Sequence, residues 1–128
     1  MTYLIDTHVL LWIVGFEEKL SKKVTDLYLD ENNEILISMA SVWEIAIKSS
    51  LNKLDIGLPL SKFVEEHILA NNIQILNFSL PQIYRIETLP YHHRDPFDRA
   101  IIAQAINENI PVITRDKHFP IYDINCVW

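Results

Sequence analysis

The stretch DPFDRAIIAQA, from Asp95 to Ala105, opens the strongest helical pattern in the chain, which we expect to run over residues 95–109. Asp95 precedes Pro96, and an aspartate N-cap followed by proline at the first helical position explains both residues structurally. Asp98 falls in the first turn, where a carboxylate complements the helix dipole but can also bind a cation. The role of Asp98 therefore depends on which other acidic residues the fold brings near it.

Short apolar runs alternate with amphipathic segments along the rest of the chain. We expect strands at residues 3–5, 34–38, 72–78, 110–116 and 122–128, and helices at residues 7–15, 20–32, 41–51, 60–70, 79–89 and 95–109. This alternation is typical of an α/β fold in which helices cover both faces of a central, mainly parallel sheet of four or five strands. Ligands of such sheets bind beyond the carboxyl ends of the strands.

Composition limits the possible classes of protein. The chain has 128 residues, two glycines and one cysteine, which fits a single compact domain over residues 1–128 without disulfides. No apolar run approaches the roughly 18 residues of a membrane span, and the start lacks a signal peptide, so we expect a cytoplasmic protein that contacts no membrane. The net charge of −6 argues against a basic nucleic-acid surface, but an acidic pocket neutralised by divalent cations would be compatible with it.

Four carboxylates beyond the cap residue Asp95 are the candidate site. Each has a structural explanation of its own: Asp6 as an N-cap, Glu44 in a capping box with Ser41, Asp98 beside the helix dipole and Asp116 in a turn. Asp6 and Asp116 end strands, and Glu44 and Asp98 are expected in the first turns of helices, so all four should meet at one edge. Their mutual repulsion would be relieved by Mg²⁺ or Mn²⁺, which prefer oxygen ligands. We therefore predict that Asp98 binds the metal.

Four stretches resemble one family in order along the chain. LIDTHVLLW, SVWEIAIK, HRDPFDRAIIAQA and VITRD are similar to PIN-domain ribonucleases, in particular VapC-type toxins of bacterial type II toxin–antitoxin pairs. The resemblance runs from Tyr3 to Phe119 and implies a PIN-like three-layer sandwich. It carries the family's catalytic, metal-binding carboxylates onto Asp6, Glu44, Asp98 and Asp116. Thr114 matches a hydroxyl position that supports the site, although an ordinary strand residue would explain it equally well.

The resemblance implies a reaction and leaves an alternative. The implied reaction is Mg²⁺- or Mn²⁺-dependent hydrolysis of RNA by metal-activated water, with Asp6, Asp98 and Asp116 as ligands and Glu44 holding a second ion or orienting the water. The alternative is a catalytically degenerate PIN-like interaction module, which the four filled acidic positions disfavour. A haloacid-dehalogenase-type phosphatase would need aspartate at His8, and a receiver domain would need a phospho-acceptor aspartate where Asn77 and Phe78 follow the third strand.

The remaining polar and aromatic residues near these motifs have less specific roles. We expect cap or rim positions for the histidines, mainly solvated surface positions with some phosphate contacts for the basic residues, and core or interface positions for the tryptophans. These residues are His8, His92, His93 and His118, then Arg94, Arg99, Arg115 and Lys117, and finally Trp12 and Trp43.

Protein partners are also implied by the resemblance. A ribonuclease toxin would be restrained by a cognate antitoxin that lays a C-terminal segment over the toxin. Apolar residues that could receive it are Val9, Trp12, Ile13, Phe16, Trp43 and Ile47. Trp12 and Phe16 lie beyond the first turn, where exposure is expected. The same surface could support a homodimer, the commonest symmetric assembly.

Overall fold

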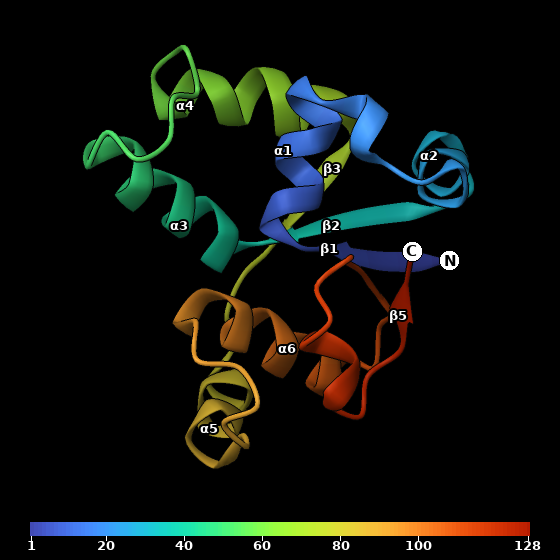
Figure 1. The fold of residues 1–128 in the computed structure, drawn as a ribbon, viewed down its shortest axis with the longest axis vertical. Helices are drawn as coiled ribbons and strands as arrows, with labels where there is room; N and C mark the ends of the chain where they lie inside the picture. Colours follow the sequence, from blue (N-terminus) through green and yellow to red (C-terminus); the bar gives the residue numbers. More distant parts are fainter.

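A computed structural model describes residues 1–128 and shows five parallel strands in one sheet (Figure 1). The strands are β1 Thr2–Ile5, β2 Glu34–Ser38, β3 Ile73–Leu76, β4 Val112–Ile113 and β5 Cys126–Val127, in the spatial order β3-β2-β1-β4-β5. The predicted parallel α/β sheet is confirmed. The chain leaves β1 toward β2 on one side and returns to β4 on the other, so the order of strands switches between β1 and β4. Ligands of open α/β sheets bind at such a point.

Helices cover both faces of the sheet (Figure 1). They are α1 Thr7–Gly15, α2 Lys22–Leu29, α3 Met39–Ser50, α4 Leu60–Phe63, α5 Leu80–Thr88 and α6 Pro96–Glu108. Short 3₁₀ turns follow at Glu17–Lys19, Leu69–Asn71 and Phe119–Ile121, and Val64–Ile68 is a π-helical stretch. The helix expected at residues 60–70 is therefore a continuous helical segment, but its hydrogen-bond pattern changes along its length.

Alternating side chains of the strands build two cores. Tyr3 and Ile5 of β1 point into the core beneath α1, α2 and α3, whereas Leu4 points into the core beneath α6. Successive side chains of a strand point to opposite faces of the sheet, so the helices that cover the two cores lie in separate layers. This agrees with the predicted three-layer sandwich. None of the helices is long and apolar enough to cross a membrane.

Helix caps determine where several of these segments begin. Ser21 accepts a hydrogen bond from the Val24 N–H at the start of α2, and Ser79 forms a capping box with Gln82 at the start of α5. Asp95 accepts hydrogen bonds from the N–H groups of Phe97 and Asp98, both at 2.9 Å. The predicted cap of α6 by Asp95 is thus confirmed, and the side chain of Asp98 is left free of that role.

Candidate active site

Asp6 lies directly after β1 and is buried, with 4% of its surface exposed. Its Oδ1 accepts a hydrogen bond of 2.8 Å from the Val9 N–H, so Asp6 is the N-cap of α1. Its Oδ2 accepts a second bond, of 2.5 Å, from the hydroxyl of Thr114 at the end of β4. Burial raises the pKa of Asp6, and these two hydrogen bonds only partly oppose the rise. Asp6 therefore joins the ends of two adjacent strands.

Glu44 differs from the expectation in its local setting. The cap of α3 is Ser38, whose side chain accepts from the Ala40 N–H, so Glu44 falls in the second turn and forms no capping box with Ser41. The predicted capping box and first-turn position are wrong because α3 begins at Met39, directly after β2. Glu44 is buried, and its Oε1 lies 2.8 Å from the hydroxyl of Thr7. Its Oε2 accepts a bond of 2.5 Å from Lys48 Nζ.

Thr7 and Ser41 orient the carboxylate of Glu44. The Thr7 hydroxyl lies 2.8 Å from both the Ser41 hydroxyl and Glu44 Oε1. Because a carboxylate only accepts, the Thr7 hydroxyl donates to Glu44 and accepts from Ser41. This chain of hydroxyl groups holds Glu44 against the first turn of α1, next to Asp6.

Asp98 is the carboxyl whose ionisation the fold perturbs most clearly. Burial raises its pKa to about 8, with further contributions from the charges of Asp95, Glu44, Asp6 and Asp116. His93 Nε2 lies 3.0 Å from Asp98 Oδ2. The structure therefore brings all four predicted carboxylates within electrostatic reach of one another.

Asp116 follows β4 and is the most exposed of the four. Its Oδ1 accepts a 2.8 Å hydrogen bond from the His118 N–H and lies 3.0 Å from His118 Nδ1, and its Oδ2 lies 3.2 Å from His93 Nε2. Although burial raises its pKa, the hydrogen bonds from His118 and His93 outweigh that effect and lower the pKa. The pKa of Asp116 is thus lowered, whereas burial raises the pKa values of Asp6 and Asp98.

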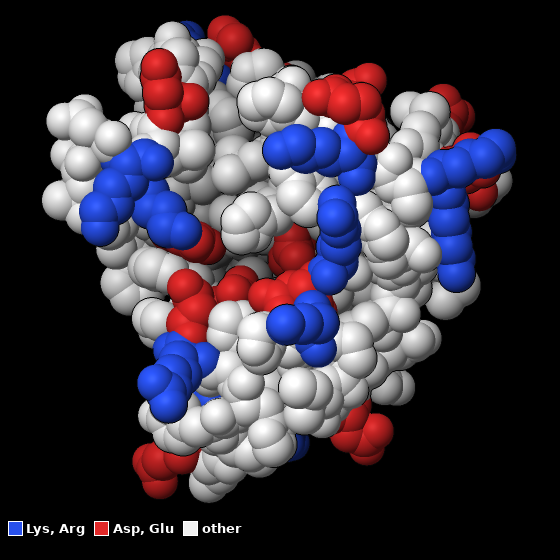
Figure 2. All heavy atoms as spheres, in the orientation of Figure 1, with Lys and Arg blue, Asp and Glu red and all other residues white.

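Two of the four acidic side chains line a hollow beside α1. A pocket of about 270 Å³ is lined by Asp6, His8, Trp12, Arg115 and Asp116. Figure 2 shows carboxylates gathered in a hollow on this face, with Lys and Arg side chains around its margin. The acidic net charge of the chain therefore does not prevent a cationic surface from surrounding an acidic site.

His93 differs from the expectation in its burial and its neighbours. A rim or cap position was expected, but its side chain is only 13% exposed and lies between Asp98 and Asp116. The loop that carries it has no periodic pattern, so its position gave no signal beyond its nearness in sequence to Asp98. His8 and His92 are exposed and His118 is partly exposed, in keeping with rim positions.

Arg99 also departs from the expectation. A solvated position was predicted, but Arg99 is 3% exposed and donates hydrogen bonds to the backbone carbonyls of Ile86, Leu89, Pro90 and His93. It lies on the face of α6 that packs against the loop after α5, and those carbonyls satisfy its guanidinium. Arg94, Arg115 and Lys117 are exposed, as predicted.

The family model of the PIN domain matches residues 3–125. This chain belongs to the PIN-domain family. Among curated proteins, this PIN domain is 23% identical to Ribonuclease VapC22 of Mycobacterium tuberculosis over 117 residues, which is 91% of this chain and 88% of the relative.

Solved structures share the fold of this PIN domain. One is VapBC2 from Rickettsia felis bound to a DNA fragment from their promoter, with a TM-score of 0.73 and 18% identity over 99% of this chain and 98% of the other. Another is a toxin–antitoxin complex from Klebsiella pneumoniae, with a TM-score of 0.62 and 18% identity over 98% and 96% of the two chains.

The two tryptophans near the proposed site, Trp12 and Trp43, differ in how far they are exposed. Trp12 is partly buried against Trp128, with ring centroids 5.7 Å apart, whereas Trp43 is 57% exposed and packs edge-on against Phe97. Trp43 is thus not a core residue.

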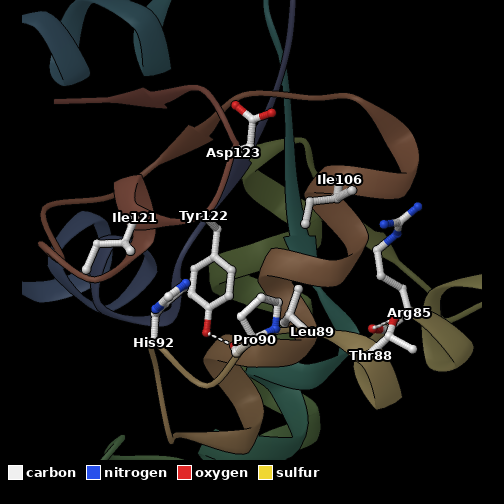
Figure 3. A pocket seen from close by; sticks show the side chains of 9 residues that line it. All are labelled: Arg85, Thr88, Leu89, Pro90, His92, Ile106, Ile121, Tyr122 and Asp123. Atoms are coloured by element: carbon white, nitrogen blue, oxygen red, sulfur yellow. Dashed lines mark hydrogen bonds between the residues drawn. The ribbon is translucent and has the colours of Figure 1, made fainter.

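A separate pocket of about 350 Å³ lies between α5, α6 and the turn Phe119–Ile121 (Figure 3), and none of the four candidate carboxylates lines it.

Proposed function

We propose that this PIN domain is a divalent-metal-dependent ribonuclease and the toxin of a toxin–antitoxin pair. The observation that carries the proposal is the convergence of Asp6, Glu44, Asp98 and Asp116 at the point where the strand order switches. The relative from Mycobacterium tuberculosis is a ribonuclease by name, which supports the reaction, and the toxin–antitoxin complex of the same fold supports the biological role.

The chemistry of these side chains fits a hard divalent cation such as Mg²⁺ or Mn²⁺. The four groups offer only carboxylate oxygens, which such ions prefer. Asp98 has a pKa of about 8, so the site without a cation holds a proton there near neutral pH. A divalent cation would neutralise the same cluster of charge and displace that proton. Asp6, Asp98 and Asp116 would hold it.

When bound, the cation stabilises charge that develops on the phosphodiester oxygens and makes water a stronger nucleophile. The side chains of this protein hold the carboxylates in fixed orientations and supply the charge around them. Thr114 fixes the carboxylate plane of Asp6, and Thr7 and Lys48 fix that of Glu44. We assign Glu44 to orienting the attacking water or to holding a second ion, since its oxygens are already held by neighbours.

Basic side chains around the hollow are suited to the RNA backbone. Arg115 lines the same pocket as Asp6 and Asp116, and Arg115 and Lys117 are exposed on either side of Asp116. Arg94 is exposed one residue before the cap of α6. Phosphate oxygens are the usual targets of such groups, and these contacts would position the strand without reading its sequence.

A matched pair of aspartate variants tests the reaction. Asp98→Asn should reduce Mn²⁺-dependent cleavage of a labelled single-stranded RNA by more than about 100-fold, because losing even an outer partner of a metal ligand costs about 10- to 100-fold. Asp95→Asn should keep most of the activity, since asparagine caps helices as well as aspartate does. Equal activity of wild type and Asp98→Asn, or none in the wild type, would favour an interaction module instead.

An apolar groove beside the hollow is the proposed antitoxin site. It has a volume of about 240 Å³, shares His8 and Trp12 with the acidic pocket, and is lined by His8, Leu11, Trp12, Val14, Gly15, Phe16, Lys19, Leu54, Asp55, Ile56 and Phe63. Phe16 is 52% exposed, as expected, whereas Val9 and Ile13 belong to the core. An antitoxin segment could fill the groove with apolar side chains and place an Arg or Lys against the carboxylates.

Binding and assembly can be measured separately from activity. Co-purification with the product of an adjacent small reading frame should be lost in Phe16→Asp but kept in Leu29→Asp, because Leu29 is exposed and does not line the groove. We also propose a homodimer, which light scattering of the free protein would detect. A monomer without affinity for the neighbouring product would remove the partner proposal and leave the nuclease proposal intact.

A further inference from the structure

His93 lies between two carboxylates that come from different parts of the fold. Its Nε2 is 3.0 Å from Oδ2 of Asp98, in the first turn of α6, and 3.2 Å from Oδ2 of Asp116, after β4. When both are ionised, two carboxylates that share one neighbour in this way repel each other unless a donor or a cation lies between them. In this structure the group between them is one imidazole nitrogen.

The other nitrogen of the ring determines what His93 can do. The backbone N–H of Asp95 donates a 3.3 Å hydrogen bond to His93 Nδ1, so Nδ1 carries a lone pair. The ring proton of a neutral imidazole then sits on Nε2, which becomes a donor to Asp98 and Asp116. His93, Asp116 and His118 have potential ligand atoms within 4.8 Å of one another, but His93 in this tautomer offers a proton there and no lone pair.

The backbone around His93 is held from two sides. Arg99 donates to the carbonyls of Pro90 and His93 at 2.9 and 3.3 Å, and its guanidinium carbon lies 3.8 Å from the centre of the Tyr91 ring. The Tyr122 hydroxyl accepts a 2.9 Å bond from the His93 N–H and donates a 2.6 Å bond to the Pro90 carbonyl. Figure 3 shows this hydroxyl pointing at Pro90 from the turn opposite. The imidazole is therefore placed by a rigid loop.

We propose that His93 is a positioning residue, whose Nε2–H holds Asp98 and Asp116 side by side so that their remaining oxygens face a common cation. The inference rests on the proposed metal-dependent function. Carboxylate ligands of metals are themselves hydrogen-bonded, and such outer partners typically change metal affinity by about 10- to 100-fold when they are removed. His118, by contrast, bonds Asp116 but not Asp98, and its side chain is 45% exposed.

Mn²⁺ binding by calorimetry to the full chain tests this role. His93→Leu should weaken Mn²⁺ binding by about 10- to 100-fold, and His93→Gln should recover most of it, because the glutamine amide can donate from the position of Nε2. His92→Leu is the matched control and should change little, because His92 is exposed and hydrogen-bonds to none of the four carboxylates. If the wild type binds Mn²⁺ and His93→Leu binds it equally well, the proposal is overturned. If the wild type itself binds no Mn²⁺, it is the proposed function that fails.

A second measurement needs no substitution and so does not depend on how the variants fold. The ¹⁵N shifts of the imidazole nitrogens in wild type should show His93 as the Nε2–H tautomer, without metal and with saturating Mg²⁺. A proton on Nδ1, or an Nε2 that loses its proton on metal addition, would make His93 a ligand and contradict the positioning role.

Discussion

The Thr114 hydroxyl donates a 2.5 Å hydrogen bond to Oδ2 of Asp6, across 108 residues of sequence. The same hydroxyl accepts a 3.0 Å bond from the Asp116 N–H. One buried side chain therefore ties together the two acidic residues that follow the neighbouring strands β1 and β4. A hydroxyl group can make both of these hydrogen bonds at once, as donor to Asp6 and as acceptor from Asp116.

Replacing Thr114 by valine keeps the shape of the side chain but removes both hydrogen bonds. We expect Thr114→Val to lower the free energy of unfolding by about 1–3 kcal/mol, because a buried carboxylate loses its donor. Thr114→Ser should keep most of the stability. Urea denaturation of the metal-free proteins would measure this, and a valine variant as stable as wild type would show that Thr114 is an ordinary strand residue.

Stability without metal should depend on pH through Asp98. Its pKa is about 8 in the folded protein against 3.8 for an unperturbed group. The folded state therefore holds more protons than the unfolded state between these values, and stability falls as pH rises through that window. Asp6 acts in the same direction, whereas the lowered pKa of Asp116 affects stability only below its unperturbed value.

Asp98→Asn should remove this fall in stability at high pH, because asparagine does not ionise. In EDTA at pH 8, Asp98→Asn should melt several degrees above wild type, since one pKa unit is worth about 1.4 kcal/mol and each kcal/mol shifts the Tm by roughly 3–6 °C in a domain of this size. The difference should shrink as pH falls toward 4, where the unfolded state also takes up this proton. A difference that is independent of pH would mean that Asp98 ionises normally.

Addition of Mn²⁺ at pH 8 should stabilise wild type more than Asp98→Asn. Wild type should gain about 2.7 kcal/mol when free Mn²⁺ is 100 times its dissociation constant, whereas Asp98→Asn should gain much less. Asp95→Asn should respond like wild type. Thermal melts across an Mn²⁺ series would measure both responses, and a larger loss in the Asp95 variant would reverse the assignment of the two aspartates.

The buried Arg99 should be sensitive to a conservative change. Arg99→Lys cannot reach four carbonyl groups with one ammonium, so we expect a loss of about 2–4 kcal/mol in unfolding free energy despite the retained charge. Arg94→Lys, at an exposed position in the same sequence motif, is the control and should be neutral. Equal denaturation midpoints for the two variants would contradict the role of Arg99 in holding the His93 loop.

Features set by local pattern could be predicted from the sequence, and features set by irregular loops could not. The parallel sheet follows from strand–helix alternation, and the cap by Asp95 follows from the Asp–Pro pair. The capping box at Ser41 was predicted wrongly because Ser38 offers an equivalent cap three residues earlier, at the end of β2. The burial of His93 and Arg99 depends on how the loop after α5 packs on α6, which no periodicity encodes.

The central claim is that the carboxylates at the β1–β4 switch hold a divalent cation. Anomalous scattering from crystals of the wild-type protein soaked in Mn²⁺ locates such an ion directly. We expect a Mn²⁺ peak among the oxygens of Asp6, Asp98 and Asp116, with His93 Nε2 outside its ligand sphere. A peak bound instead by His93, Asp116 and His118, or no peak at this edge of the sheet, would contradict it.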